Sequence, residues 1–105
     1  MEFYKFIPFR NQLFFKSMHK KFKILGKVQG VFFRKSTQER AGDLNLKGWV
    51  RNEEDGSVIV FIQGGEQEVQ QMAEWLKHGP ETADVQQLLL LDEGYDMPCK
   101  GFEII

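Results

Sequence analysis

The sequence predicts an α+β sandwich in which two helices cover one face of an antiparallel sheet. Two stretches carry apolar residues at helical spacing, and short alternating or β-branched runs lie before, between and after them. The expected order along the chain is strand, helix, strand, strand, helix, strand, with a short strand at the end. A chain of 105 residues is long enough for one domain with a single apolar core.

The first expected strand covers residues 21–28. Phe22 and Ile24 point to one side and lysines alternate with them, which is typical of a half-buried strand. A turn follows that contains Gly26 and Gly30. Glycine lacks a Cβ, so the backbone at these two positions can adopt conformations that other residues rarely take.

The two expected helices cover residues 33–44 and 66–78. The apolar face of the first helix is spaced by four, four and three residues, and it comprises Phe33, Thr37, Ala41 and Leu44. The inner stripe of the second helix comprises Val69, Met72, Ala73 and Leu76. Glutamates at the start of the second helix suit its dipole, and the Gly-Pro pair after it is a stop signal.

The remaining strands are expected over residues 47–52, 57–63, 85–91 and 101–105. An Asp-Gly pair joins the first two of them and predicts a β-hairpin. The resulting βαββαβ order is that of a ferredoxin-like sandwich, in which both helices pack on the same face of the sheet.

The composition, 42% hydrophobic and 28% charged, is ordinary for a globular protein. The net charge of −1 hides an asymmetry, because six of the first 23 residues are lysine or arginine against a single glutamate. This segment therefore carries +5 and the remainder −6. An acidic body argues against a nucleic-acid-binding domain, which needs a broad positive footprint. Cys99 is the only cysteine, so no intramolecular disulfide can form.

Residues 1–18 are predicted to be an N-terminal extension of unknown role, and residues 19–105 the folded domain. Three interpretations of the first 17 residues stay open: a segment upstream of a functional chain that begins near Met18, a segment that packs on the domain or mediates self-association, and a targeting segment. No run of about 20 apolar residues predicts a membrane span. The extension also lacks the continuous apolar core of a secretory signal. We expect a cytoplasmic monomer.

The stretch ILGKVQGVFFR, residues 24–34, indicates a strand end, a tight turn and a helix start. Such a turn can point the backbone N–H groups of Gln29, Gly30, Val31 and Phe32 inward, beside the positive end of the helix. Arg34 lies in the first helical turn, where a cation is unfavourable unless an anion accompanies it. The pattern predicts a phosphate-binding cradle, with a solvated arginine as the alternative. Because the cradle depends on backbone shape, Gly30→Ala is expected to weaken phosphate binding more than Gln29→Ala.

A second segment, GWVRNEEDGSVIVFIQG at residues 48–64, follows the first at a fixed separation. The pair resembles the acylphosphatase family, which combines a G-x-V-Q-G-V-x-F-R loop with a G-W-V-x-N-x-x-x-G-x-V strand pair. The resemblance runs from about Lys20 to Ile105 and implies the ferredoxin-like fold. It also implies an enzyme that hydrolyses the carboxyl–phosphate anhydride bond of a small-molecule acyl phosphate, with no cofactor and no metal.

The resemblance assigns roles to two side chains. It implies that Arg34 binds the phosphoryl group and stabilises its charge, and that Asn52 orients the attacking water. Taken alone, Asn52 fits a turn residue that hydrogen-bonds locally. Glu53 departs from the family, in which a small polar residue such as threonine is common at this position. A carboxylate there would weaken the binding of an anion unless it points away from the site.

Two other functions fit parts of the sequence. An RNA-binding module would carry stacking aromatic residues on its central strands, but the run over residues 57–63 offers only Phe61. A non-catalytic phosphate-binding or regulatory acylphosphatase-like domain would bind phosphate without turning substrate over.

The histidines and the large aromatic residues have simpler interpretations. His19 and His78 lie apart from any cluster at metal-ligand spacing, so no metal site is expected. Cys99 has no adjacent histidine in the sequence and is not interpreted as a nucleophile. Trp49 is expected to contribute apolar bulk to the core.

Overall fold

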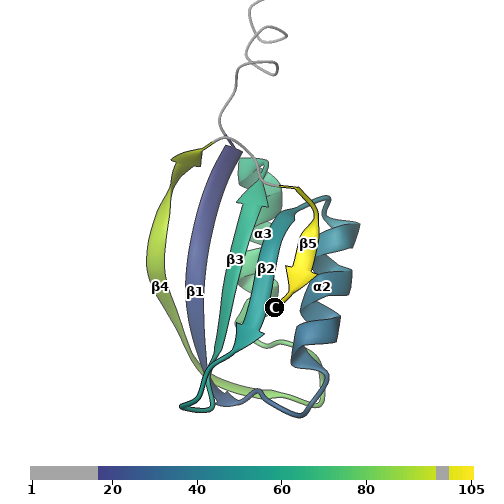
Figure 1. Cartoon of the computed structure of the whole chain (residues 1–105), viewed down its shortest axis with the longest axis vertical. Coiled ribbons are helices and arrows are strands. Elements are labelled where there is room, and N and C mark those ends of the chain that lie inside the picture. Colours follow the sequence, from purple (N-terminus) through teal and green to yellow (C-terminus); the bar gives the residue numbers. More distant parts are fainter. Residues whose placement is uncertain (1–16, 97–99) are drawn as a thin grey trace, which may run out of the picture.

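The computed structural model describes residues 17–96 and 100–105, which form a five-stranded sheet with two helices on one face (Figure 1). The elements are β1 (Ser17–Lys27), α2 (Phe33–Asp43), β2 (Lys47–Asn52), β3 (Val58–Gly64), α3 (Glu66–Leu76), β4 (Asp84–Asp96) and β5 (Phe102–Ile104). The strand order is β4-β1-β3-β2-β5. The predicted α+β sandwich is therefore confirmed, and the other face of the sheet is left open.

The sheet differs from the prediction at its two edges. β5 runs parallel to β2, so one pair in the sheet is parallel. β4 extends well beyond its predicted end because the acidic stretch that follows the leucines still pairs with β1, which itself begins at Ser17. An edge strand exposes one side to water, so charged residues such as Asp92 and Glu93 are compatible with strand pairing there.

The core lies between the helices and the sheet. α2 buries Phe33, Thr37 and Ala41, and α3 buries Val69, Met72 and Leu76, as their apolar spacing predicts. The strands contribute six residues to the buried apolar cluster: Phe22, Ile24, Val50, Val58, Val60 and Ile62. Each helix is slightly shorter than predicted, α2 ending at Asp43 and α3 at Leu76. No helix in the described part of the chain is long and apolar enough to cross a membrane.

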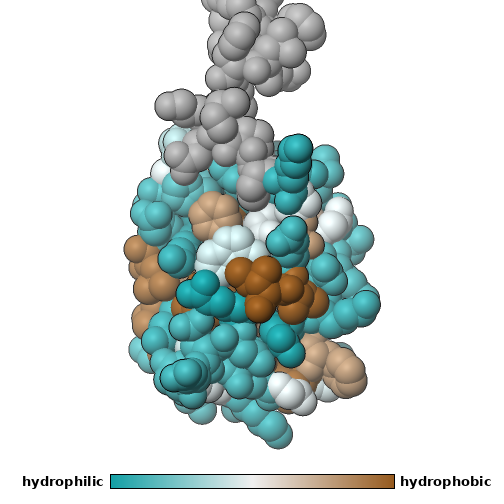
Figure 2. Space-filling model, in the orientation of Figure 1, coloured by the Kyte–Doolittle hydropathy of each residue, from teal (hydrophilic) through white to brown (hydrophobic). Residues whose placement is uncertain are grey.

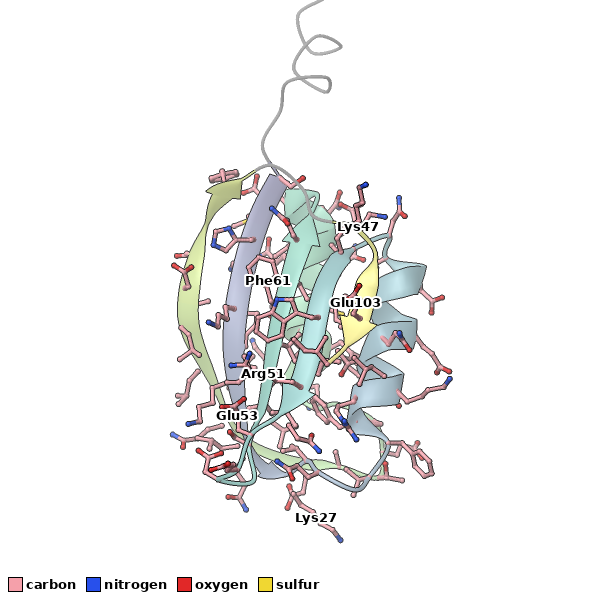
Figure 3. All side chains as sticks on the ribbon, in the orientation of Figure 1. Lys27, Lys47, Arg51, Glu53, Phe61 and Glu103 are labelled. Carbon is pink, nitrogen blue, oxygen red and sulfur yellow. The ribbon has the colours of Figure 1, made fainter. Side chains whose placement is uncertain are left out.

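The open face of the sheet holds an aromatic cluster, and the prediction that Trp49 belongs to the core is wrong. Trp49 stacks on Phe61 with ring centroids 5.9 Å apart, and His19 stacks on the other side of Phe61 at 5.3 Å. The guanidinium of Arg51 lies 4.9 Å from the Trp49 ring. Figure 3 shows Phe61, Arg51 and Glu53 on this face. Trp49 lies here because residues one apart in a strand point to opposite faces, and its neighbour Val50 fills the core.

Candidate functional site

The loop from β1 to α2 depends on unusual backbone conformations. A Cβ at Gly26 would lie 2.2 Å from the carbonyl oxygen of Asp84, so only glycine allows β1 and β4 to approach this closely. Gly30 has space for a side chain but adopts φ 73°, which favours glycine. Phe32 adopts φ 63° without that advantage, at a cost of about 1–2 kcal/mol. The loop shape is therefore fixed at three positions before the helix begins.

The N-terminus of α2 lacks the groups that usually stabilise the start of a helix. The first turn contains no acidic residue, and no side chain caps it. Arg34 and Lys35 lie in this turn, where the helix dipole disfavours each cation by about 0.3–1 kcal/mol. Positive charge therefore accumulates at the same end of the molecule as the β1–α2 loop (Figure 1).

A cavity of about 350 Å³ opens beside this helix start. Its lining comprises Val28, Gly30, Phe32, Phe33, Arg34, Lys35, Asn52 and Ile104. Asn52 reaches it from the end of β2, and Ile104 reaches it from β5. Two cations and no carboxylate side chain appear in this lining, as far as the described residues define it. The structure thus brings Arg34 and Asn52, which belong to different elements, to one cavity.

The other predicted loop residues divide into two groups. Gly30 and Phe32 line the cavity, whereas Gln29 and Val31 do not appear in its lining. The side-chain amide of Gln29 instead donates hydrogen bonds to the carbonyl oxygens of Glu53 and Ser57, each 2.8 Å long. The carbonyl oxygen of Val31 accepts a hydrogen bond of 2.5 Å from the Thr82 hydroxyl.

Gln29 therefore has a structural role that the sequence analysis did not predict. Its two hydrogen bonds tie the β1–α2 loop to the β2–β3 hairpin immediately after Asn52. A half-buried amide needs partners, but the sequence does not say which backbone carbonyls will be within reach. The bond to the hairpin fixes the distance between the two halves of the cavity wall.

Glu53 turns away from the cavity. Its carboxylate accepts a hydrogen bond of 2.6 Å from Nε of Arg51, on the open face of the sheet. The residue is absent from the cavity lining. The negative charge of Glu53 is thus paired with Arg51 and does not face the cavity.

Asp55 holds the turn of the hairpin that follows Asn52. Asp55 accepts hydrogen bonds from the backbone N–H and the hydroxyl of Ser57, and its carboxylate pairs with the Lys23 ammonium at 2.8 Å. The hydrogen bond from Lys23 is the main cause that holds the pKa of Asp55 well below its ordinary value, with the Ser57 bonds adding to it. The same bond raises the pKa of Lys23. These contacts fix the turn and involve no residue of the cavity lining.

Within residues 17–96 and 100–105, no group of three or more histidine, cysteine or acidic side chains could hold a metal ion. Cys99 and the first 16 residues lie outside the described residues, so the predictions made for them stay predictions. His19 is buried on β1, where its Nε2 lies 3.2 Å from a carboxylate oxygen of Asp92.

Comparisons with a family model, with curated sequences and with solved structures all match this chain to acylphosphatases. The acylphosphatase family model matches residues 20–104. An acylphosphatase from Aeromonas salmonicida is 55% identical over 62 residues, which are 59% of this chain and 69% of that protein. An acylphosphatase from Burkholderia thailandensis is 40% identical over 81 residues, covering 77% of this chain and 83% of that protein. The solved structure of an acylphosphatase from Coxiella burnetii matches with a TM-score of 0.74 at 30% identity, covering 86% of this chain and 94% of that one.

Proposed function

The chain belongs to the acylphosphatase family of hydrolases, and we propose that it cleaves the carboxyl–phosphate anhydride bond of acyl phosphates through Arg34 and Asn52. The observation that carries this proposal is the position of the two side chains, which line one cavity although they come from α2 and β2. The products are a carboxylate and inorganic phosphate.

In this proposal, Arg34 and the β1–α2 loop bind the phosphoryl group. A guanidinium presents paired N–H donors that match two phosphate oxygens, and it keeps its charge at any physiological pH. The backbone N–H groups of Gln29, Gly30, Val31 and Phe32 complete the cradle in this proposal. The positive end of α2 adds to the field at the same place.

Asn52 positions the water that attacks phosphorus. An amide can both donate and accept hydrogen bonds but is too weakly basic to remove a proton from water. The role therefore rests on orientation, which is a large part of catalysis in phosphoryl transfer. As water adds to phosphorus, the bond from phosphorus to the bridging oxygen breaks, and that oxygen leaves with the carboxylate. A non-bridging oxygen of the substrate phosphate accepts the proton of the water.

Arg34 and the loop act on the transition state by holding the charge that develops on the transferring group. Positioned donors of this kind contribute roughly 10²–10³-fold in rate when one of them is removed. The carboxylate is a good leaving group, so this electrostatic contribution and the oriented water suffice without a covalent intermediate.

The test is hydrolysis of benzoyl phosphate by wild type, Arg34→Ala and Asn52→Ala, each checked for folding by circular dichroism. Both variants are expected to lose roughly 10²–10³-fold in kcat/KM while remaining folded. Arg40→Ala is the matched control, because this arginine lies in the last turn of the same helix and outside the cavity lining. It is expected to retain wild-type turnover.

The outcomes separate catalysis from binding. Wild-type turnover that survives in folded Arg34→Ala would overturn the assignment of this residue. If the wild type binds phosphate in an Arg34-dependent way but does not hydrolyse acyl phosphates, the chain is a phosphate-binding or regulatory relative. A cytoplasmic location is a further proposal, supported by the single cysteine, and a monomeric state is proposed with it.

A further inference from the structure

Phe32 is an exposed aromatic residue, so burial in the core does not explain why a phenylalanine lies at this position. It is 76% exposed, more than any other large apolar residue in the described part of the chain. Its backbone is left-handed at φ 63°, a conformation that disfavours an aromatic residue. The other described non-glycine residue with positive φ is Asn45, a type that tolerates this conformation. Strain of this kind at the edge of a cavity is a reason to look for a ligand contact.

A second apolar side chain meets the same cavity from the far end of the sequence. Ile104 lies on β5, is 38% exposed and lines the cavity together with Phe32. It is held in place because β5 pairs with β2 at Val50, whose carbonyl oxygen accepts a hydrogen bond of 2.9 Å from the Ile105 N–H. Figure 2 shows hydrophobic side chains where β5 ends and where α2 begins.

The cavity lining consequently combines two kinds of surface. Arg34, Lys35 and Asn52 provide charge and hydrogen-bonding groups, whereas Phe32 and Ile104 provide exposed apolar surface. An acyl phosphate has the same division, with a dianionic phosphoryl group joined through oxygen to an acyl group. When the phosphoryl group binds the cations, the acyl group must occupy the remaining part of the cavity.

We propose that Phe32 and Ile104 form the acyl-binding subsite and select acyl phosphates with an apolar, preferably aromatic, acyl group. This inference rests on the proposed function, since it needs the phosphoryl group to lie against Arg34. Phe32 offers a ring face for stacking, and Ile104 offers an aliphatic surface that lines the same cavity. Polar or very small acyl groups cannot use either surface.

The experiment compares benzoyl phosphate with acetyl phosphate, which share the reacting bond and differ in the acyl group. The readout is the ratio of the two kcat/KM values. Wild type is expected to favour benzoyl phosphate, and Phe32→Ala and Ile104→Ala are each expected to reduce the ratio roughly tenfold, as for the loss of one apolar contact in a pocket. Because both substrates report on the same enzyme sample, a partly unfolded variant does not change the ratio.

Two further variants separate the ring from the backbone. Phe32→Asn also removes the ring but suits a left-handed backbone, so a fall in the ratio equal to that of Phe32→Ala assigns the effect to the ring. Leu90→Ala removes an equally apolar side chain, 48% exposed on β4 and outside the cavity lining, and is expected to leave the ratio unchanged.

The failure of the inference is distinguishable from the failure of the proposed function. Hydrolysis of both compounds with a ratio that the Phe32 and Ile104 variants do not move overturns the acyl subsite alone. If wild type hydrolyses neither compound, the proposed function is wrong and the subsite falls with it.

Discussion

The two helices occupy the same face of the sheet and have 11 residues each, but they begin in opposite ways. α3 starts with Glu66 and Glu68, whose negative charges suit the positive end of the helix. α2 starts with Arg34 and Lys35, contains no acid in its first turn, and follows a strained Phe32. The preferences for charge and backbone conformation at a helix start are met in α3, away from the cavity, and violated in α2, beside it. Such violations are expected at functional sites, where they lower stability.

The largest expected effect comes from the core face of α3. Met72 is fully buried, so Met72→Ala is expected to lower the free energy of unfolding by about 2–5 kcal/mol. Urea denaturation measures the loss, and benzoyl phosphate hydrolysis per folded molecule should stay close to wild type because α3 lies outside the cavity lining. Gln71→Ala, at an exposed neighbour on the same helix, should change neither quantity. A specific loss of turnover in folded Met72→Ala would mean that α3 also shapes the site.

The second prediction concerns the tie between the loop and the hairpin. Gln29→Ala removes two hydrogen bonds and is expected to lower the free energy of unfolding by about 1–3 kcal/mol. Turnover of benzoyl phosphate should also fall, roughly tenfold or more, because Asn52 is no longer held at a fixed position relative to the loop.

Gln38→Ala is the matched control for this variant. Its amide makes one hydrogen bond, to the carbonyl oxygen of Phe102, so a smaller loss of stability and little loss of turnover are expected. Equal losses of turnover in the Gln29 and Gln38 variants would show that the tie to the hairpin has no special role. The sequence of the loop predicts a mild effect of Gln29→Ala, and the two hydrogen bonds of its amide predict a larger one.

Much of the fold was predictable because it depends on short-range patterns. The spacing of Phe33, Thr37 and Ala41 identified the buried face of α2, and the alternation around Phe22 identified β1. The faces of the strands were harder to assign. Whether Trp49 or Val50 points into the core depends on which side of β2 the helices cover, and the pattern of β2 alone does not reveal this.

The candidate site was predictable only where the loop and strand motifs carried it. Arg34 and Asn52 could be named from their positions in the two motifs, although their roles stay proposals. Ile104 and the Gln29 tie could not be named, since both depend on pairings between distant parts of the chain. The φ angle of Phe32 was also hidden, because sequence gives no sign that an aromatic residue will be left-handed.

The inner face of α2 contains a further exception. Thr37 is fully buried, and its hydroxyl has no hydrogen-bond partner among the residues that the structure describes. Thr37→Val keeps the shape and removes the unpaired polar group, so it is expected to raise the free energy of unfolding by about 1 kcal/mol. The reciprocal change on α3, Val69→Thr, should lower it by a similar amount. Destabilisation by Thr37→Val in urea denaturation would indicate that water or a backbone carbonyl pairs with the hydroxyl.

The smallest effect gives the most direct test of the contrast between the helices. Removing the charge of Glu66 or of Arg34 should change the free energy of unfolding in opposite directions, because the helix dipole favours Glu66 and disfavours Arg34. Glu66→Gln is expected to lower the free energy of unfolding by about 0.3–1 kcal/mol, and Arg34→Gln to raise it by a similar amount. Both side chains are exposed, so packing changes little in either variant.

Salt and phosphate distinguish the dipole from other causes of these two shifts. Both should shrink at high ionic strength, since exposed charges are screened within about 10 Å at 0.1 M salt. Inorganic phosphate should stabilise the wild type but not Arg34→Gln. The arginine is unfavourable at the helix start when no anion is bound and favourable when an anion is bound. If Arg34→Gln instead destabilises the protein without phosphate, the guanidinium stabilises the fold itself, and the first turn of α2 no longer shows a conflict between stability and function.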